Sequence, residues 1–169
     1  MTDARIDELL DAIGSEKPGA VEKLLNSGLD INTFGTNSTR FNVLTQAAMK
    51  GDVNLIRKLR DHGAIFDYAD SEGLTAMHFA AMSGECDSIR TLVELGATVD
   101  IDCSQLFTPL MIAAAFGELD AIRTLISLGA DIEHRDQWGM SACDVADEKG
   151  YEESVKLLKS YGALYRHER

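Results

Sequence analysis

Glycine recurs in this chain at a fixed spacing of 33 residues, in two independent series. The first series is Gly51, Gly84, Gly117 and Gly150, and the second is Gly63, Gly96, Gly129 and Gly162. Self-similarity at a period between about 20 and 50 residues is typical of a stack of identical supersecondary units. A chain with this period folds as a linear array, in which each unit contacts mainly its neighbours.

Each unit carries two helical patterns. Between its two glycines, apolar residues recur at i and i+3, as on one face of an α-helix. These pairs are Ile56 and Leu59, Ile89 and Leu92, Ile122 and Leu125, and Val155 and Leu158. The glycine that follows stands where a left-handed residue ends a helix. Before the first glycine lie the alanine pairs Ala47–Ala48, Ala80–Ala81 and Ala113–Ala114. We therefore predict two short antiparallel helices, a glycine stop and an extended connection in every unit.

Three motifs carry a family resemblance. The segment from Asp70 to Ala81 reads Asp-Ser-Glu-Gly-Leu-Thr-Ala-Met-His-Phe-Ala-Ala, Thr108 begins Thr-Pro-Leu, and Leu128 begins Leu-Gly-Ala-Asp-Ile. In these motifs the chain resembles the ankyrin repeat family. The resemblance implies an all-α solenoid of about five helix-turn-helix units joined by short finger loops.

The resemblance also implies a domain organisation. It places full repeats at 37–66, 70–99, 103–132 and 136–165, and a degenerate N-terminal capping repeat at 1–32, with helices over 6–13 and 18–26. We expect these units to form one domain over 1–169. Gly28 precedes Gly63 by 35 residues, so two residues are inserted in the first connection, which we place within 34–40.

The chain departs from the family pattern at a few positions. His78 is the family's structural histidine and is predicted to bridge backbone between repeats. The turn glycine is present at Gly73 and Gly139, but Arg40 and Leu106 replace it in the other two units. We expect these two turns to be less ideal, because the replaced position needs a positive φ, which glycine adopts most readily. The last unit has a polar first helix, which suits a terminal cap. Its polar residues are Asp144, Asp147, Glu148 and Lys149.

The charge of the chain bears on its partners. The net charge is −12, and residues 51–150 hold 18 Asp and Glu against 7 Lys and Arg. Such a surface repels phosphate backbones, which excludes nucleic acid and favours a basic protein. Part of the acidity has a structural reason, because many acids stand where second helices begin and cap free N–H groups. These acids are Asp52, Glu85, Asp87, Glu118, Asp120, Glu152 and Glu153.

No catalytic, metal-binding or cofactor-binding motif is present. The chain lacks a phosphate-binding glycine loop and the HExxH and GxSxG motifs. Its histidines are His62, His78, His134 and His167, at different repeat positions; we expect His62 and His134 to be solvated. Cys86 and Cys143 are predicted to be packed on helices and Cys103 to be more exposed in a turn. We therefore predict that the protein is not an enzyme and that it needs no cofactor or metal.

The location is predicted from the same residues. The acidic N-terminus shows no secretory signal, and no apolar run approaches the roughly 18 residues of a membrane span. Three cysteines without a CxxC motif fit a reducing compartment. These features predict a cytoplasmic protein that does not bind membranes, and we expect it to be monomeric by itself.

One set of residues is predicted to bind a partner. The residue after the turn position is Phe41, Leu74, Phe107 or Met140 in successive units, and these would form an apolar ladder. The acids expected around the ladder are Glu72, Asp102, Glu133 and Asp136. The full set of predicted partner-binding residues is Phe41, Tyr68, Glu72, Leu74, Met82, Gln105, Phe107, Phe116, Trp138 and Met140. Aromatic residues and Met are typical of interface anchors, although neighbouring fingers could instead bury these side chains against each other.

The sequence thus predicts a non-catalytic protein–protein interaction module. It would bind a basic or amphipathic protein through its concave and finger face. One version is an inhibitor or immunity-type protein that blocks a toxin or enzyme, which the acidity and small size favour. The alternative is a scaffold or adaptor in signalling or complex assembly, and the sequence leaves both open.

Overall fold

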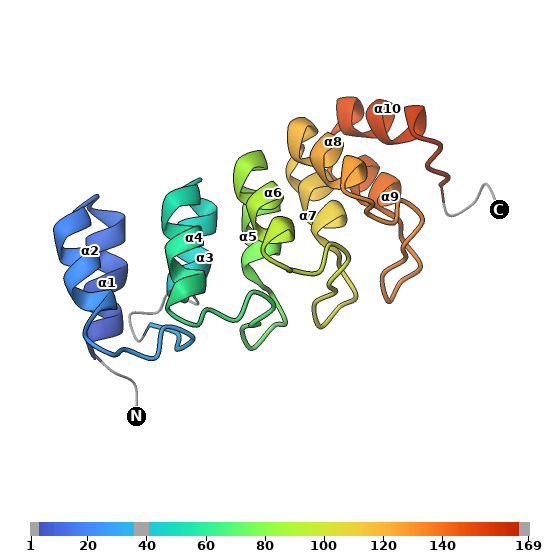
Figure 1. The fold of residues 1–169 in the computed structure, drawn as a ribbon. Helices are drawn as coiled ribbons and strands as arrows, with labels where there is room; N and C mark the ends of the chain where they lie inside the picture. Colours follow the sequence, from blue (N-terminus) through green and yellow to red (C-terminus); the bar gives the residue numbers. More distant parts are fainter. Residues whose placement is uncertain (1–3, 36–40, 166–169) are drawn as a thin grey trace.

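The computed structural model describes residues 4–35 and 41–165, and in these ranges the chain forms ten α-helices and no strand (Figure 1). The helices follow one another as α1 (Ala4–Gly14), α2 (Pro18–Leu25), α3 (Val43–Met49), α4 (Val53–Asp61), α5 (Ala76–Met82), α6 (Cys86–Glu94), α7 (Pro109–Phe116), α8 (Leu119–Ser127), α9 (Ala142–Glu148) and α10 (Glu152–Ser160). They lie as antiparallel pairs side by side in chain order, with α1 and α10 at opposite ends and the connecting loops projecting from one edge. This confirms the predicted all-α solenoid.

The first helix of each repeat begins at a residue that can cap it. Asn42, Thr75, Thr108 and Ser141 occupy equivalent N-cap positions, and all four are buried. Asn42 Oδ1 accepts from the N–H of Thr45 at 2.8 Å, and Pro109 follows Thr108 as the first residue of α7. Side-chain oxygens at this position satisfy backbone N–H groups that have no partner within the helix.

The second helices end as the glycine pattern predicts. Gly63 has a φ of 83° and follows α4, and the N–H of Ala64 donates to the carbonyl of Leu59 at 2.9 Å. This is the arrangement of a Schellman motif, which needs a left-handed residue. Gly96, Gly129 and Gly162 also have positive φ. The second glycine series therefore ends one helix per unit.

The core runs along the array rather than forming one globule. The first helices α3, α5, α7 and α9 pack on one another, and the alanine pairs of α3, α5 and α7 are fully buried between them. The second helices contribute Ile56, Ile89 and Ile122, which are also inaccessible to solvent. Small residues in one layer and branched residues in the next let successive units stack closely.

The acids at the starts of second helices only partly behave as predicted. Asp52 caps α4, accepting from the N–H of Leu55 at 2.9 Å. Glu85 and Glu118 stand at the equivalent positions but make no side-chain cap bond. Each carboxylate instead lies over a glycine of the preceding unit: Glu85 over Gly51, and Glu118 over Gly84. The capping prediction is therefore wrong for these two residues, because their longer side chains reach the neighbouring unit.

The N-terminal unit is the predicted helix pair with small changes. It consists of α1 and α2, and α2 ends at Leu25, with Asn26 as its C-cap. Arg40 and most of the segment in which we placed the insertion lie outside the described residues. The boundaries of the predicted repeats and of the single domain stay predictions.

Candidate functional site

Two fingers are shaped by an aspartate and a glycine. Asp70 Oδ1 accepts from the N–H groups of Glu72 and Leu74 at 2.8 and 2.9 Å. In the finger that starts at Asp136, the equivalent oxygen accepts from Trp138 and Met140, both at 2.8 Å. Gly73 and Gly139 have φ of 81° and 76° and complete these turns. We call these loops the Asp70 finger (residues 70–74) and the Asp136 finger (136–140).

The finger between them is built differently. In this Cys103 finger (residues 103–107), Cys103 occupies the aspartate position and Leu106 the glycine position. Leu106 has a φ of 61°, and its N–H donates to the Cys103 carbonyl at 2.8 Å. A side chain in this left-handed region is strained. This confirms the prediction that the turn is less ideal at Leu106.

Hydrogen bonds tie the three fingers together. The N–H of Ser104 donates to the carbonyl of Glu72 at 2.9 Å, and the N–H of Gln137 donates to the carbonyl of Gln105 at 3.4 Å. His78 Nε2 lies 3.0 Å from the carbonyl oxygen of Phe107. This bond confirms that His78 bridges repeats. The fingers therefore form one connected surface rather than separate loops.

A cleft of about 370 Å³ opens between the Asp70 and Cys103 fingers. Four of the predicted partner-binding residues line it: Glu72, Leu74, Gln105 and Phe107. The other lining residues are Cys103, Ser104 and Ile112, which the sequence analysis did not select. Trp138 stands beside this finger cleft, with its ring centroid 6.2 Å from that of Phe107 and 55% of the residue exposed. A small apolar cleft with a few polar groups is typical of a binding site.

The other predicted residues lie elsewhere along the array. Phe41 is half-buried, with its ring edge-on to Phe79 at 5.3 Å, and Tyr68 stacks on Phe34 at 5.4 Å. Met82 and Phe116 end α5 and α7; Met82 is half-buried and Phe116 is exposed. Met140 is half-buried.

The four ladder residues Phe41, Leu74, Phe107 and Met140 are thus all partly covered. Leu106, which the sequence analysis did not select, is more exposed than any of them. Its left-handed turn brings its side chain to the surface, and a leucine in a turn-glycine position was the available signal.

The predicted acidic rim is smaller than expected. Asp136 is only 5% exposed, because its carboxylate is used inside its own turn. Glu133 is half-buried, lies 3.8 Å from Arg135, and accepts from the N–H of Leu164 at 3.1 Å. Glu72 and Asp102 are exposed. Of the four predicted rim acids, only Glu72 and Asp102 are therefore exposed, and Glu72 lines the finger cleft.

The remaining histidines and cysteines also differ in part from expectation. His62 and His134 were expected to be solvated, but both are half-buried. A ring nitrogen of His62 lies 3.0 Å from the Lys58 carbonyl oxygen, and one of His134 lies 3.0 Å from the Leu106 carbonyl oxygen. Cys143 is buried, as predicted. Cys86 is half-buried like Cys103, because it stands at the start of α6. His167 lies outside the described residues.

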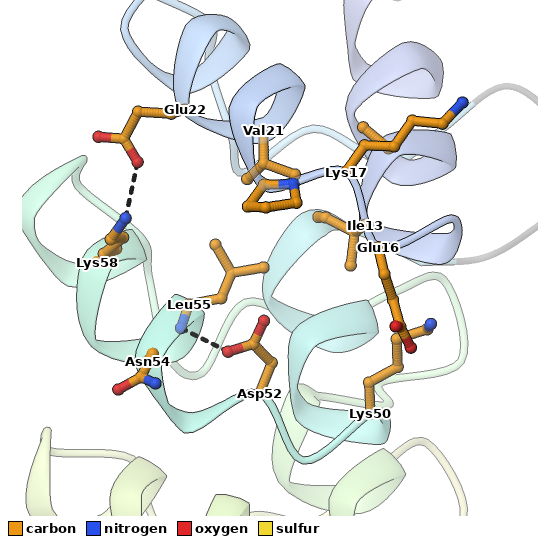
Figure 2. A pocket seen from close by; sticks show the side chains of 12 residues that line it. Ile13, Glu16, Lys17, Val21, Glu22, Lys50, Asp52, Asn54, Leu55 and Lys58 are labelled. Carbon is orange, nitrogen blue, oxygen red and sulfur yellow. Dashed lines mark hydrogen bonds and ion pairs between the residues drawn. The ribbon is translucent and has the colours of Figure 1, made fainter.

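A second cleft, of about 530 Å³, lies between the N-terminal helix pair and the α3–α4 pair (Figure 2). Its apolar wall includes Ile13, Val21 and Leu55. Figure 2 shows Lys58 paired with Glu22 at one side, where Nζ and Oε2 are 2.7 Å apart. Acidic and basic side chains alternate around this N-terminal cleft, so its charge favours no particular class of ligand.

Two further observations concern the described part of the chain. Among residues 4–35 and 41–165, no three His, Cys, Asp or Glu side chains are grouped so that they could hold a metal ion. No helix in these ranges is both long and apolar enough to cross a membrane.

Stacked helix pairs joined by hydrogen-bonded fingers define a helical-repeat solenoid. A model of the ankyrin repeat family (three copies) matches residues 9–105 and 99–168. The chain belongs to the ankyrin repeat family. A search of curated proteins found no match. Ankyrin repeats are generally protein–protein interaction modules and are typically non-catalytic.

Proposed function

We propose that this protein binds a basic protein segment with exposed apolar side chains on its finger face, and that it performs no catalysis. The observation that supports this most is the combination of the finger cleft with Trp138. An open cleft, an exposed indole beside it and the exposed Leu106 form an apolar surface with Glu72 and Asp102 near it. Exposed aromatic residues in such a setting are typical of binding hot spots.

The charge of the chain supports the basic character of the partner. A net charge of −12 attracts a basic protein over long distances and speeds its approach. At close range, Glu72 and Asp102 offer carboxylates to Lys or Arg, while the cleft takes an apolar side chain. Phosphate-bearing ligands would meet repulsion from the same charges.

We propose that binding blocks the partner, as an inhibitor or immunity-type protein would. An acidic surface of this kind can cover a basic active site or substrate channel. The alternative role is that of a scaffold or adaptor, which would need a second binding surface. We also propose a cytoplasmic location, since three free cysteines suit a reducing compartment. We further propose that the protein is monomeric by itself.

The test uses Trp138→Ala with a matched control, Ile65→Ala. Ile65 is 53% exposed but follows α4 and lies outside the finger cleft. A basic partner recovered from cell extract on the immobilised wild-type chain is titrated with wild type and both variants. Loss of a hot-spot aromatic should weaken binding by roughly 30-fold, while the control stays within about twofold.

Unchanged affinity of Trp138→Ala, with its helicity and melting temperature intact, would remove the finger face from the proposal. The association rate should also fall steeply as salt rises, and a flat dependence would argue against a basic partner. Stoichiometric loss of the partner's own activity would favour blocking. A complex that leaves that activity intact and recruits a third protein would favour an adaptor.

A further inference from the structure

The Cys103 finger lacks an acceptor that its two neighbours have. In the Asp70 and Asp136 fingers, one carboxylate oxygen accepts from two backbone N–H groups, those of the second and fourth residues after the aspartate. The equivalent groups in the Cys103 finger are the N–H of Gln105 and the N–H of Phe107. In place of the aspartate stands a thiol, which is a weak acceptor.

Nothing in the described part of the chain replaces that acceptor. Cys103 Sγ bonds neither N–H, and no other backbone or side-chain oxygen accepts from Gln105 or Phe107. The carbonyls of both residues are used, since Gln105 accepts from Gln137 and Phe107 accepts from Cys103. The turn therefore holds two backbone donors that have no protein acceptor, within a hydrogen-bonded loop. A backbone donor without a protein acceptor can pair with an acceptor that a ligand brings.

Gln105 and Phe107 both line the finger cleft. The same cleft offers apolar contact from Leu74 and Ile112 and a carboxylate from Glu72. Two residues that carry such donors, an apolar wall and an acid thus line one small opening. Such a set matches a short stretch of polypeptide, which carries an acceptor, an apolar side chain and a basic side chain on neighbouring residues.

We infer that the Cys103 finger binds an extended segment of the partner protein, whose backbone carbonyl takes the place of the missing aspartate oxygen. An apolar side chain of the segment enters the finger cleft, and an adjacent Lys or Arg lies near Glu72 or Asp102. This inference rests on the proposed function and adds to it the conformation of the bound segment and the groups that hold its backbone.

The acceptor is a neutral carbonyl because the surroundings are acidic. A carboxylate would meet repulsion from Glu72 and Asp102, whereas a peptide carbonyl would not. The segment is extended because a helix uses its carbonyls internally, four residues along the chain. An extended chain leaves carbonyls free and places alternate side chains on one face.

The test installs the missing acceptor. Cys103→Asp and Cys103→Asn would each satisfy both N–H groups from within the finger, as Asp70 and Asp136 do in theirs. Cys103→Ala is the matched control, because it removes the thiol and leaves both donors open. Cys103→Asp also adds a negative charge, which by itself would strengthen binding of a basic segment. Weaker binding by Cys103→Asp would therefore report the loss of the donors.

The probe is an acetylated and amidated decapeptide of alternating Lys and Leu, compared with the same residues reordered to helical spacing. The alternating peptide should bind more tightly, and it should move the amide proton resonances of Gln105 and Phe107 downfield. Cys103→Asp and Cys103→Asn should each weaken its binding by roughly tenfold, the effect of losing one or two hydrogen bonds. Cys103→Ala should bind as the wild type does.

Binding of Cys103→Asp and Cys103→Asn at wild-type strength would overturn the inference, and so would tighter binding of the helically spaced peptide. If either of these results is found while Trp138 fluorescence still responds to the peptide, the proposed function is kept and only the extended segment with its carbonyl contact is rejected. If neither the Trp138 fluorescence nor the two amides respond to either peptide, the extended-segment inference and the finger-face proposal both fall.

Discussion

His78 and Phe107, from neighbouring units, are joined by a bond of 3.0 Å between the imidazole Nε2 and the Phe107 carbonyl oxygen. On its other side, Nδ1 accepts from the N–H of Thr75 at 3.2 Å. A neutral ring with its proton on Nε2 satisfies both contacts at once. This one side chain therefore links the start of α5 to the Cys103 finger, and it places the Phe107 backbone at the finger cleft.

The first prediction concerns acid stability. Burial lowers the pKa of His78 below its usual value of about 6.5, against smaller opposing effects of the Phe107 carbonyl and of Asp70 and Asp102. The unfolded chain therefore binds the proton first as the pH falls. The stability contributed by neutral His78 is full above about pH 6.5 and is lost as the pH falls toward the lowered pKa.

The free energy of unfolding of the wild type should accordingly drop by up to about 1.4 kcal/mol per pH unit in that window. In His78→Gln this part of the pH dependence should vanish. Subtracting the variant's free energy of unfolding from that of the wild type at each pH removes the contribution of the other titrating groups. If the free energies of unfolding of the two proteins changed in parallel from pH 7 to 5, this would contradict a lowered His78 pKa.

The second prediction concerns the strained turn. Leu106 has a φ of 61°, and Asn adopts this left-handed conformation at lower cost than Leu. Leu106→Asn should therefore raise the free energy of unfolding by about 1 kcal/mol. The control is Gln105→Asn, since Gln105 has no positive φ and should change stability by less than about 0.5 kcal/mol. Chemical denaturation measures both, and a destabilised Leu106→Asn would show that Leu106 contributes more by contact than it loses by strain.

The third prediction concerns the contact between fingers. Gly63 and Gly73 have nearly the same φ, 83° and 81°. A Cβ added to Gly73 would lie 2.8 Å from the backbone nitrogen of Ser104, whereas a Cβ added to Gly63 would meet nothing within 4 Å. Gly63→Ala should therefore cost only the conformational strain, about 1 kcal/mol. Gly73→Ala should cost at least about 1 kcal/mol more, because the Ser104 backbone must shift. Equal melting temperatures for the two variants would mean that the Asp70 and Cys103 fingers do not pack closely at Gly73.

The fourth prediction concerns the last unit. Asp144 accepts from the N–H of Ser141 at 2.9 Å, lies 3.1 Å from Arg135 Nη1, and has a side chain only 12% exposed. Asp144→Ala should lower the free energy of unfolding by about 2–3 kcal/mol, because it removes a cap and leaves Arg135 without this partner.

The matched control for Asp144→Ala is Glu153→Ala. Glu153 pairs with Lys156 at 2.7 Å, but both side chains are largely exposed. An exposed pair of this kind contributes little to the free energy of unfolding, so Glu153→Ala should change it far less than Asp144→Ala does. Similar losses in the two variants, measured by urea denaturation, would show that burial adds nothing to the Asp144 interaction.

Some features of the candidate site could be read from local sequence and some could not. The substitution of Gly by Leu106 predicted an unusual turn, since the need for positive φ is a property of single residues. The same reasoning placed Glu72, Leu74, Gln105 and Phe107 among the partner-binding candidates, and these four do line one cleft. It missed Ile112, which reaches the cleft from α7. It also assigned Asp136 to a solvated rim, although that side chain is used inside its own turn.

The sequence by itself determined the architecture. Two glycine series and the apolar spacing between them repeat every 33 residues, and helix stops, caps and apolar faces are local properties that each unit carries alone. Only the tertiary structure decided which side chains are covered and where the surface opens. Those outcomes depend on the neighbouring unit: the Glu85 carboxylate lies over Gly51, Trp138 stands beside Phe107, and the finger cleft forms between two loops that are a full unit apart in sequence.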